Sequence, residues 1–136
     1  MQRTPENEGL TLGAFEKLDI DFYQQPPTLF AQRPNRQVVP ITGLSDGTRD
    51  QLYLALRIAA LELHMEKATQ FPFVADDLFI NFDDARSKAG LKALFELSKK
   101  TQVMFLSHQE HLLPVVKELF GASVNVIQLN DQLAEA

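Results

Sequence analysis

Short apolar runs alternate with helical patterns through the second half of the chain, and this alternation constrains the fold more than any other feature. The runs are Phe71–Ala75, Gln102–Ser107 and Ser123–Leu129, and a helical pattern fills each interval between them. A short continuous apolar run is typical of a strand covered on both faces. Strands that alternate with helices at this spacing predict a parallel α/β layer.

Three helices are expected from the spacing of apolar residues. The first covers residues 48–66 and carries apolar side chains around most of its circumference, which predicts a buried helix. The second covers Asp83–Lys100, with Asp83 as its N-terminal cap. The third covers Glu110–Phe120, with Pro114 near its first turn, where proline is tolerated. These helices and the three apolar runs are the expected parts of one α/β unit over residues 43–131.

The first third of the chain has a different pattern. Residues 1–9 form a polar tail, and residues 10–42 predict a small antiparallel meander. Apolar and polar residues alternate from Leu18 to Phe22, which is the period of a half-buried strand. Two further short strands are expected at Thr28–Gln32 and Gln37–Ile41, joined by a tight turn. Pro40 places the last of them at a sheet edge or a strand end.

Composition excludes several classes of protein. The chain has 136 residues, a net charge of −5 and no cysteine, so it has neither a disulfide scaffold nor a thiolate metal site. No apolar run approaches the roughly 18 residues of a membrane span. No block of lysine and arginine supplies the clustered positive charge that autonomous binding to nucleic acid requires. These features fit a cytoplasmic protein without membrane contact.

The loop Gly43–Thr48 leads straight into the first helix. Free backbone N–H groups and the positive end of the helix dipole make a helix start suitable for a phosphate, and glycine allows the backbone to approach a ligand closely. The alternative is an ordinary capped helix. Thr48 and Gln51 match a capping box, and Ser45 is a second candidate for the cap. Both interpretations of the loop remain open from the pattern alone.

Polar side chains follow two of the apolar runs. Asp76 and Asp77 come after the first run, and His108 comes after the second. In open parallel sheets ligands bind beyond the carboxyl ends of the strands. One carboxylate there can hold Mg²⁺, and its neighbour can polarise a water for attack on a phosphate. Alternatively, the acids form a capping loop and His108 is structural. His108 and His111 lack a third nearby ligand for zinc.

Taken in order, these motifs resemble the second half of an ABC-type ATPase head, and in particular the SMC and double-strand-break-repair branch with its SbcC-type and YhaN-type ATPases. A signature-like loop, a strand with two acids, a D-loop at Phe82 and Asp83, and a switch histidine at His108 follow one another at the family's spacing. The match runs from Gly43 to Leu112. The signature-like loop consists of Leu44, Ser45, Asp46, Gly47 and Thr48.

The resemblance implies a fold and a set of roles. The fold is the C-terminal half of an ABC ATPase head, with a parallel sheet and flanking helices, and the cofactors are ATP and Mg²⁺. Asp76 holds Mg²⁺, Asp77 is the general base and His108 senses the γ-phosphate. Asp83 couples the two sites of a head-to-head dimer. The signature residues, together with Gln51, act on ATP held by the other head.

Three departures from the family pattern bear on activity. Asp46 stands where the family prefers glycine, and Asp77 is shorter than the family's glutamate. No glycine is followed by lysine, so the Walker A loop is absent. We therefore expect either a fragment of a longer protein or a piece cut at a coiled-coil junction, inactive as an ATPase on its own. The implied partners are the N-terminal Walker A lobe, a second head, a nuclease subunit, and DNA through the whole assembly in DNA repair or chromosome maintenance.

Two rival functions remain. A non-catalytic ABC-like scaffold dimerises with little or no ATP turnover, and the shorter carboxylate of Asp77 motivates it. A metal-dependent nuclease of the Toprim kind would use Asp19 and Asp21 as its acidic pair. That fold needs a glutamate at a strand end well upstream, and the only glutamates well upstream of the pair, Glu6 and Glu8, lie within the polar tail.

Overall fold

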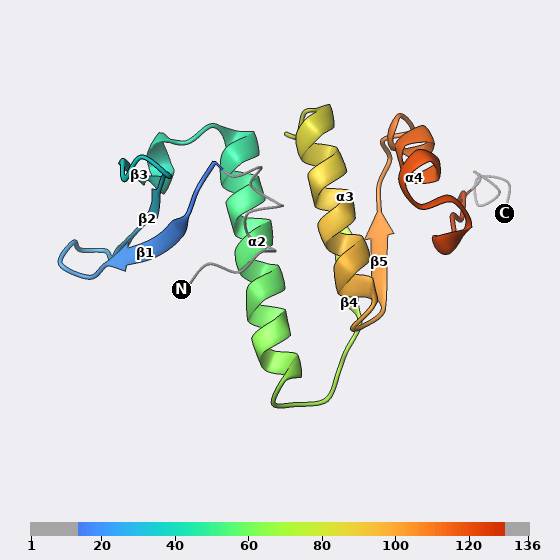
Figure 1. Cartoon of the computed structure of the whole chain (residues 1–136), viewed down its shortest axis with the longest axis horizontal. Helices are drawn as coiled ribbons and strands as arrows, with labels where there is room; N and C mark the ends of the chain where they lie inside the picture. Colours follow the sequence, from blue (N-terminus) through green and yellow to red (C-terminus); the bar gives the residue numbers. More distant parts are fainter. Residues whose placement is uncertain (1–13, 130–136) are drawn as a thin grey trace, which may run out of the picture.

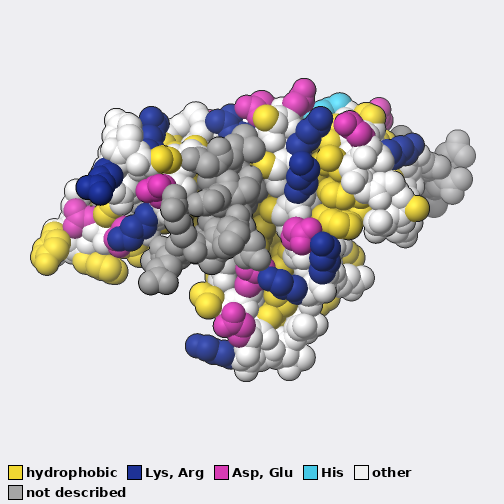
Figure 2. Space-filling view, viewed as in Figure 1, with side chains coloured by type: hydrophobic (Ala, Val, Ile, Leu, Met, Phe, Trp, Pro, Cys, Tyr) yellow, Lys and Arg dark blue, Asp and Glu magenta, His cyan; other side chains and the backbone are white. Residues whose placement is uncertain are grey.

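The computed structural model describes residues 14–129. It begins with an antiparallel sheet of three strands, β1 (Lys17–Asp21), β2 (Thr28–Gln32) and β3 (Val38–Pro40), in the order β1-β2-β3. The register pairs Ile20 with Leu29 and Phe30 with Pro40. Pro40 lies on an edge strand, where its missing N–H costs no sheet hydrogen bond. The meander expected from the sequence is confirmed, and apolar side chains gather at the tip of its β1–β2 hairpin (Figure 2).

Helix α2 (Asp46–Met65) follows the short 3₁₀ helix η1 (Ile41–Gly43) and stands between the meander and the rest of the molecule (Figure 1). Its buried side chains serve two cores. Leu52 packs with the meander, in a cluster that contains Phe15, Ala31 and Ile41. Residues further along α2 pack against the α/β part instead. This explains why the helix is apolar around most of its circumference. No helix in the described range is long and apolar enough to cross a membrane.

The α/β part contains two parallel strands, β4 (Phe73–Asp76) and β5 (Val103–Leu106), with α3 (Asp84–Ser98) between them in sequence. The register pairs Phe73 with Val103 and Asp76 with Leu106. One face of this sheet packs into the core with Leu91, Leu94 and Leu97 of α3. The other face carries three exposed apolar side chains, Val74, Met104 and Leu106.

The last expected strand is absent from the described residues. Helix α4 (Leu112–Phe120) ends at Gly121, whose φ of +53° suits glycine, and the 3₁₀ helix η2 (Gly121–Ser123) follows. Residues 124–129 form no strand, and Ile127 and Leu129 are largely exposed. A strand is stable only when a neighbour pairs with its backbone groups, and neither β4 nor β5 supplies that pairing here. The prediction of a strand at Ser123–Leu129 is therefore wrong for this structure.

Candidate functional site

The motif residues gather at one end of the α/β part. β5 points toward the end at which α2 and α3 begin, and β4 runs parallel to β5 (Figure 1). The carboxyl ends of the two strands and the amino ends of the two helices therefore share one edge of the molecule. Strand ends and helix starts are the places where α/β folds bind anionic ligands.

Asp77 and His108 contact each other directly. Asp77 follows β4, and His108 follows β5 after one intervening residue. The Asp77 Oδ2 atom lies 2.8 Å from Nδ1 of His108, and the His108 backbone N–H donates to Oδ1 over 3.3 Å. Asp77 has a φ of +47°, in the left-handed region that aspartate tolerates better than most residues. The structure thus brings together two site residues that lie 31 positions apart.

The contact with His108 changes the acidity of Asp77. The side-chain hydrogen bond from His108 is the main cause that lowers the pKa of the Asp77 carboxyl below its ordinary value, and partial desolvation opposes it. A hydrogen bond to the charged form of a carboxyl favours ionisation. Asp77 is therefore an ionised carboxylate at neutral pH and a weaker base than a free aspartate.

Asp76 differs from its neighbour. It ends β4 on the same face as Val74, and its side chain is exposed. Its carboxylate has no hydrogen bond or ion pair to any residue in the described range. An exposed carboxylate with free oxygen atoms is the donor type that Mg²⁺ prefers, so Asp76 fits the metal-binding role in its chemistry.

At the start of α2, Ser45 is the N-terminal cap. Its Oγ accepts a hydrogen bond from the backbone N–H of Thr48 over 3.4 Å. Of the two caps that the sequence left open, the structure therefore selects Ser45. Asp46 pairs with the guanidinium of Arg49 and remains largely exposed. The pairing offsets part of the negative charge that Asp46 brings to this loop.

Gly47 is buried against another loop of the same chain. A Cβ atom at Gly47 would overlap the backbone carbonyl oxygen of Asn81, in the segment between β4 and α3. Asn81 in turn donates from Nδ2 to Oδ2 of Asp50 over 2.9 Å. Glycine is therefore required at position 47 for packing within the chain, whatever else the loop contacts.

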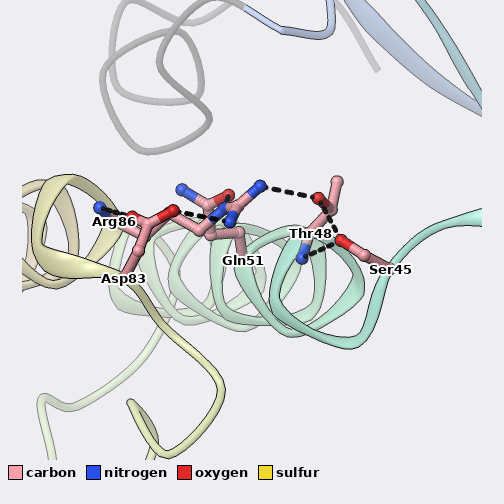
Figure 3. Close-up of polar contacts among 5 residues, drawn as sticks. All are labelled: Ser45, Thr48, Gln51, Asp83 and Arg86. Atoms are coloured by element: carbon pink, nitrogen blue, oxygen red, sulfur yellow. Dashed lines mark hydrogen bonds and ion pairs between the residues drawn. The ribbon is translucent and has the colours of Figure 1, made fainter.

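Arg86 joins the two helix starts (Figure 3). It lies in the first turn of α3, and Asp83 caps that helix by accepting from the Arg86 backbone N–H over 2.8 Å. The guanidinium reaches back to α2 and contacts Gln51 and Thr48. The side chains of Gln51 and Leu44 are buried, so neither points outward from the loop in this arrangement.

Sequence reasoning did not single out Arg86 or Asn81. One signal was available for Arg86. A cation in the first turn of a helix opposes the helix dipole, so an arginine at that position implies specific partners elsewhere in the fold. Asn81 gives no such signal, because its role depends on the approach of Gly47 from a distant part of the sequence.

The remaining candidate residues have local partners. Asp19 accepts from the backbone N–H of Ile20, and Asp21 accepts from that of Tyr23. Within residues 14–129, no three histidine, aspartate or glutamate side chains cluster in a way that could hold a metal ion. Glu6 and Glu8 lie outside the described residues.

Comparison with known proteins places this geometry in context. No protein-family model matches the chain. The chain is 38% identical over 105 residues to the uncharacterized protein YhaN of Bacillus subtilis, a stretch that covers 76% of this chain and 10% of YhaN. Its structure is similar to the SMC head domain from Thermotoga maritima, with a TM-score of 0.55 and 24% identity, over 83% of this chain and 38% of that one. The chain thus spans a small part of each of these proteins.

Proposed function

The chain has the fold of the C-terminal lobe of an SMC-like ATPase head, and from this premise we propose that it supplies half of an ATP site whose occupation drives association of two heads. The observation that carries the proposal is the shared edge: the carboxyl ends of β4 and β5, which Asp77 and His108 follow, lie at the same end of the lobe as the start of α2 (Figure 1). In this proposal, one lobe supplies the strand-end groups that act on the nucleotide of its own head. It also supplies a loop that binds the phosphate of the nucleotide in the opposite head.

The loop at the start of α2 contacts the ATP of the opposite head in this proposal. Its residues Ser45 and Asp46 are exposed, and the positive end of the helix dipole favours a phosphate there. The side chains of Leu44 and Gln51 are buried and support the loop from the inner side. Thr48 and Gly47 hold it against α3 and the segment before it.

The groups at the strand ends act on the nucleotide of the same head. Asp76 is the residue that would hold Mg²⁺, which when bound neutralises charge on the phosphates. Asp77 accepts a proton from the attacking water, and its lowered pKa keeps it ionised for that purpose. His108 orients the Asp77 carboxylate through its ring and its backbone N–H and contacts the γ-phosphate.

One observation favours a second candidate function, a dimerising scaffold with little ATP turnover. Both carboxylate oxygens of Asp77 are engaged by His108, and hydrogen bonds to a carboxylate weaken it as a base. In the scaffold, ATP still joins the heads, but the water is not activated. The two functions share the binding geometry and differ in turnover alone.

The proposed partner inside the complete protein is an N-terminal Walker A lobe. Val74, Met104 and Leu106 form an exposed apolar face on the β4–β5 sheet, and such a face favours burial against another element. We further propose that the complete protein acts in the cytoplasm in DNA repair or chromosome maintenance, reaching DNA and a nuclease subunit only through the whole assembly.

Replacement of Ser45 in the complete protein tests the proposal. Ser45→Arg places a long side chain on the exposed loop and leaves Asp76, Asp77 and His108 untouched. We expect ATP to bind but neither to join two heads nor to turn over. Ser98→Arg, the same change at the opposite end of α3, is the matched control and should dimerise normally. ATP-driven dimerisation of Ser45→Arg, measured by sedimentation or light scattering, would contradict the proposal.

A further inference from the structure

Arg86 makes side-chain hydrogen bonds to three residues on two helices. Nε donates to Oε1 of Gln51 over 2.9 Å, Nη1 to Oδ2 of Asp83 over 2.8 Å, and Nη2 to Oγ1 of Thr48 over 3.0 Å (Figure 3). Gln51 and Thr48 lie 35 and 38 positions from Arg86 in sequence. The planar guanidinium therefore fixes the start of α3 relative to the start of α2 with three differently directed bonds.

The surroundings make these bonds difficult to replace. The Arg86 side chain is 29% exposed, and Gln51 is 3% exposed. A lysine in place of Arg86 keeps the charge but presents a single ammonium group, which cannot reach three acceptors in a fixed plane. Arginine remains charged at all relevant pH values and has no acceptor atom. Thr48 Oγ1 must therefore act as the acceptor in its contact with Arg86.

This requirement, together with the exposure of the two residues, favours one direction for the next hydrogen bond. Oγ1 of Thr48 and Oγ of Ser45 are 2.8 Å apart, and geometry alone allows either to donate. If Ser45 donated, the Thr48 O–H would have no acceptor among the described residues. If Thr48 donates, the O–H without an acceptor in the described chain is that of Ser45, which is exposed and can donate to solvent, whereas Thr48 is half-buried. Ser45 Oγ then accepts from both the O–H and the backbone N–H of Thr48.

With both lone pairs occupied, the Ser45 hydroxyl can only donate, and it donates away from the helix. Ser45 is exposed, so its O–H is available at the outer surface as a donor to an anion. We infer that Arg86 is a positioning residue that acts through Thr48 to orient the Ser45 hydroxyl toward a phosphate oxygen. The inference rests on the proposed function, because that function supplies the phosphate.

The same guanidinium also binds Asp83, the residue proposed to couple two heads. Asp83 is exposed, and its carboxylate oxygens accept from the backbone and from the side chain of Arg86. A displacement of Asp83 by an opposite head would therefore move Arg86 and loosen its bond to Thr48. Arg86 thus links Asp83, which contacts the other head in this proposal, to the Ser45 hydroxyl, which contacts the nucleotide of that head.

A pair of substitutions in the complete protein tests the inference. The measured quantity is the dissociation constant of two heads in the presence of Mg²⁺ and a non-hydrolysable ATP analogue. Ser45→Ala and Arg86→Lys should each weaken association about tenfold, the scale of one hydrogen bond to a charged group. In a Ser45→Ala background, Arg86→Lys should have little further effect, because its target hydroxyl is gone. Arg57→Lys, the same change at an exposed site on α2, is the control and should leave association unchanged.

Thr48→Val breaks the same chain of hydrogen bonds but leaves Arg86 in place. It should change the dissociation constant of the two heads as Arg86→Lys does, both with Ser45 present and in the Ser45→Ala background. The inference is overturned if Ser45→Ala weakens association while Arg86→Lys and Thr48→Val act equally with and without the Ser45 hydroxyl, which is the result expected of a merely structural role. If Ser45→Ala leaves association unchanged, the proposed function itself fails and the inference falls with it. The two failures are therefore distinguishable in one set of measurements.

Discussion

Gly47, in the first turn of α2, lies so close to the backbone carbonyl of Asn81 that no side chain fits between them. This approach seats the loop before α3 against the start of α2, beside the contact between Asn81 and Asp50. The glycine of a signature-like loop thus has a role inside its own lobe. Any account of this loop as a ligand-binding element has to include that internal role.

Gly47→Ala should lower the free energy of unfolding by about 1–3 kcal/mol, the usual cost of forcing an extra methyl group into a packed site. The methyl meets a backbone atom, which cannot rotate away. Gly43→Ala is the matched control, since its Cβ would lie 3.8 Å from Pro40 in ordinary contact. Urea denaturation of both variants measures the difference. Equal stability of the two would show that the segment around Asn81 moves freely.

Asp77→Asn should reduce ATP turnover of the complete protein by about a hundredfold or more, the scale of losing a general base. Asparagine tolerates the left-handed backbone at this position as well as aspartate does, so the fold is retained. ATP should then hold the heads together, and gel filtration with ATP would detect the dimer. Asp84→Asn, an exposed change in the first turn of α3, serves as the control. Unchanged turnover in Asp77→Asn would favour the scaffold.

His108→Ala should raise the pKa of the Asp77 carboxyl, because the hydrogen bond that lowers it is lost. A carboxyl whose pKa is lower in the folded state stabilises the fold above its unfolded pKa, and this stabilisation disappears as the pH falls through the folded pKa. Wild-type protein should therefore lose more stability below about pH 4 than His108→Ala does. Titration of the Asp77 carboxyl carbon by NMR measures the shift directly, and identical midpoints would contradict the pairing.

Mixing two inactive variants should restore activity if the Ser45 loop acts on the ATP of the other head. In a mixed dimer of Ser45→Arg and a Walker A lysine variant of the complete protein, both lesions fall on one composite site. The second site is then intact and should turn over ATP. Steady-state ATPase assays across mixing ratios would reveal a maximum at an intermediate ratio. ATPase activity that shows no maximum across the mixing ratios would indicate that Ser45 acts within its own head, or that a single intact site does not hydrolyse ATP.

Val74→Lys should destabilise the complete protein more than Val38→Lys does. Both valines are exposed on short strands, at 54% and 56%, and the change is identical. Val74, however, lies on the sheet face proposed to pack against the N-terminal lobe, where a buried lysine has no partner. Thermal unfolding of the two variants tests this face. Equal melting temperatures would show that nothing covers it.

The sequence by itself determined the local elements and their order. Thr28–Gln32 is a strand within the bounds expected, and Asp83 caps α3 as its residue type indicates. Periodicity and capping depend on residues that are close together in the chain, so they can be recognised in the sequence alone. The order of the motifs also indicated the SMC-like fold that comparison with the SMC head domain supports.

Only the tertiary structure decided which groups meet. The bonds of Arg86 to Gln51 and Thr48, the carbonyl against Gly47 and the hydrogen bonds between Asp77 and His108 all join residues more than 30 positions apart. The missing strand after Ser123 has the same cause, since an apolar run becomes a strand only beside a partner that accepts its hydrogen bonds. The periodicity of the sequence contains no information about which distant residues become neighbours in the fold. Packing of α2 against α3 brings Arg86 to Gln51 and Thr48, and the pairing of β4 with β5 brings Asp77 to His108.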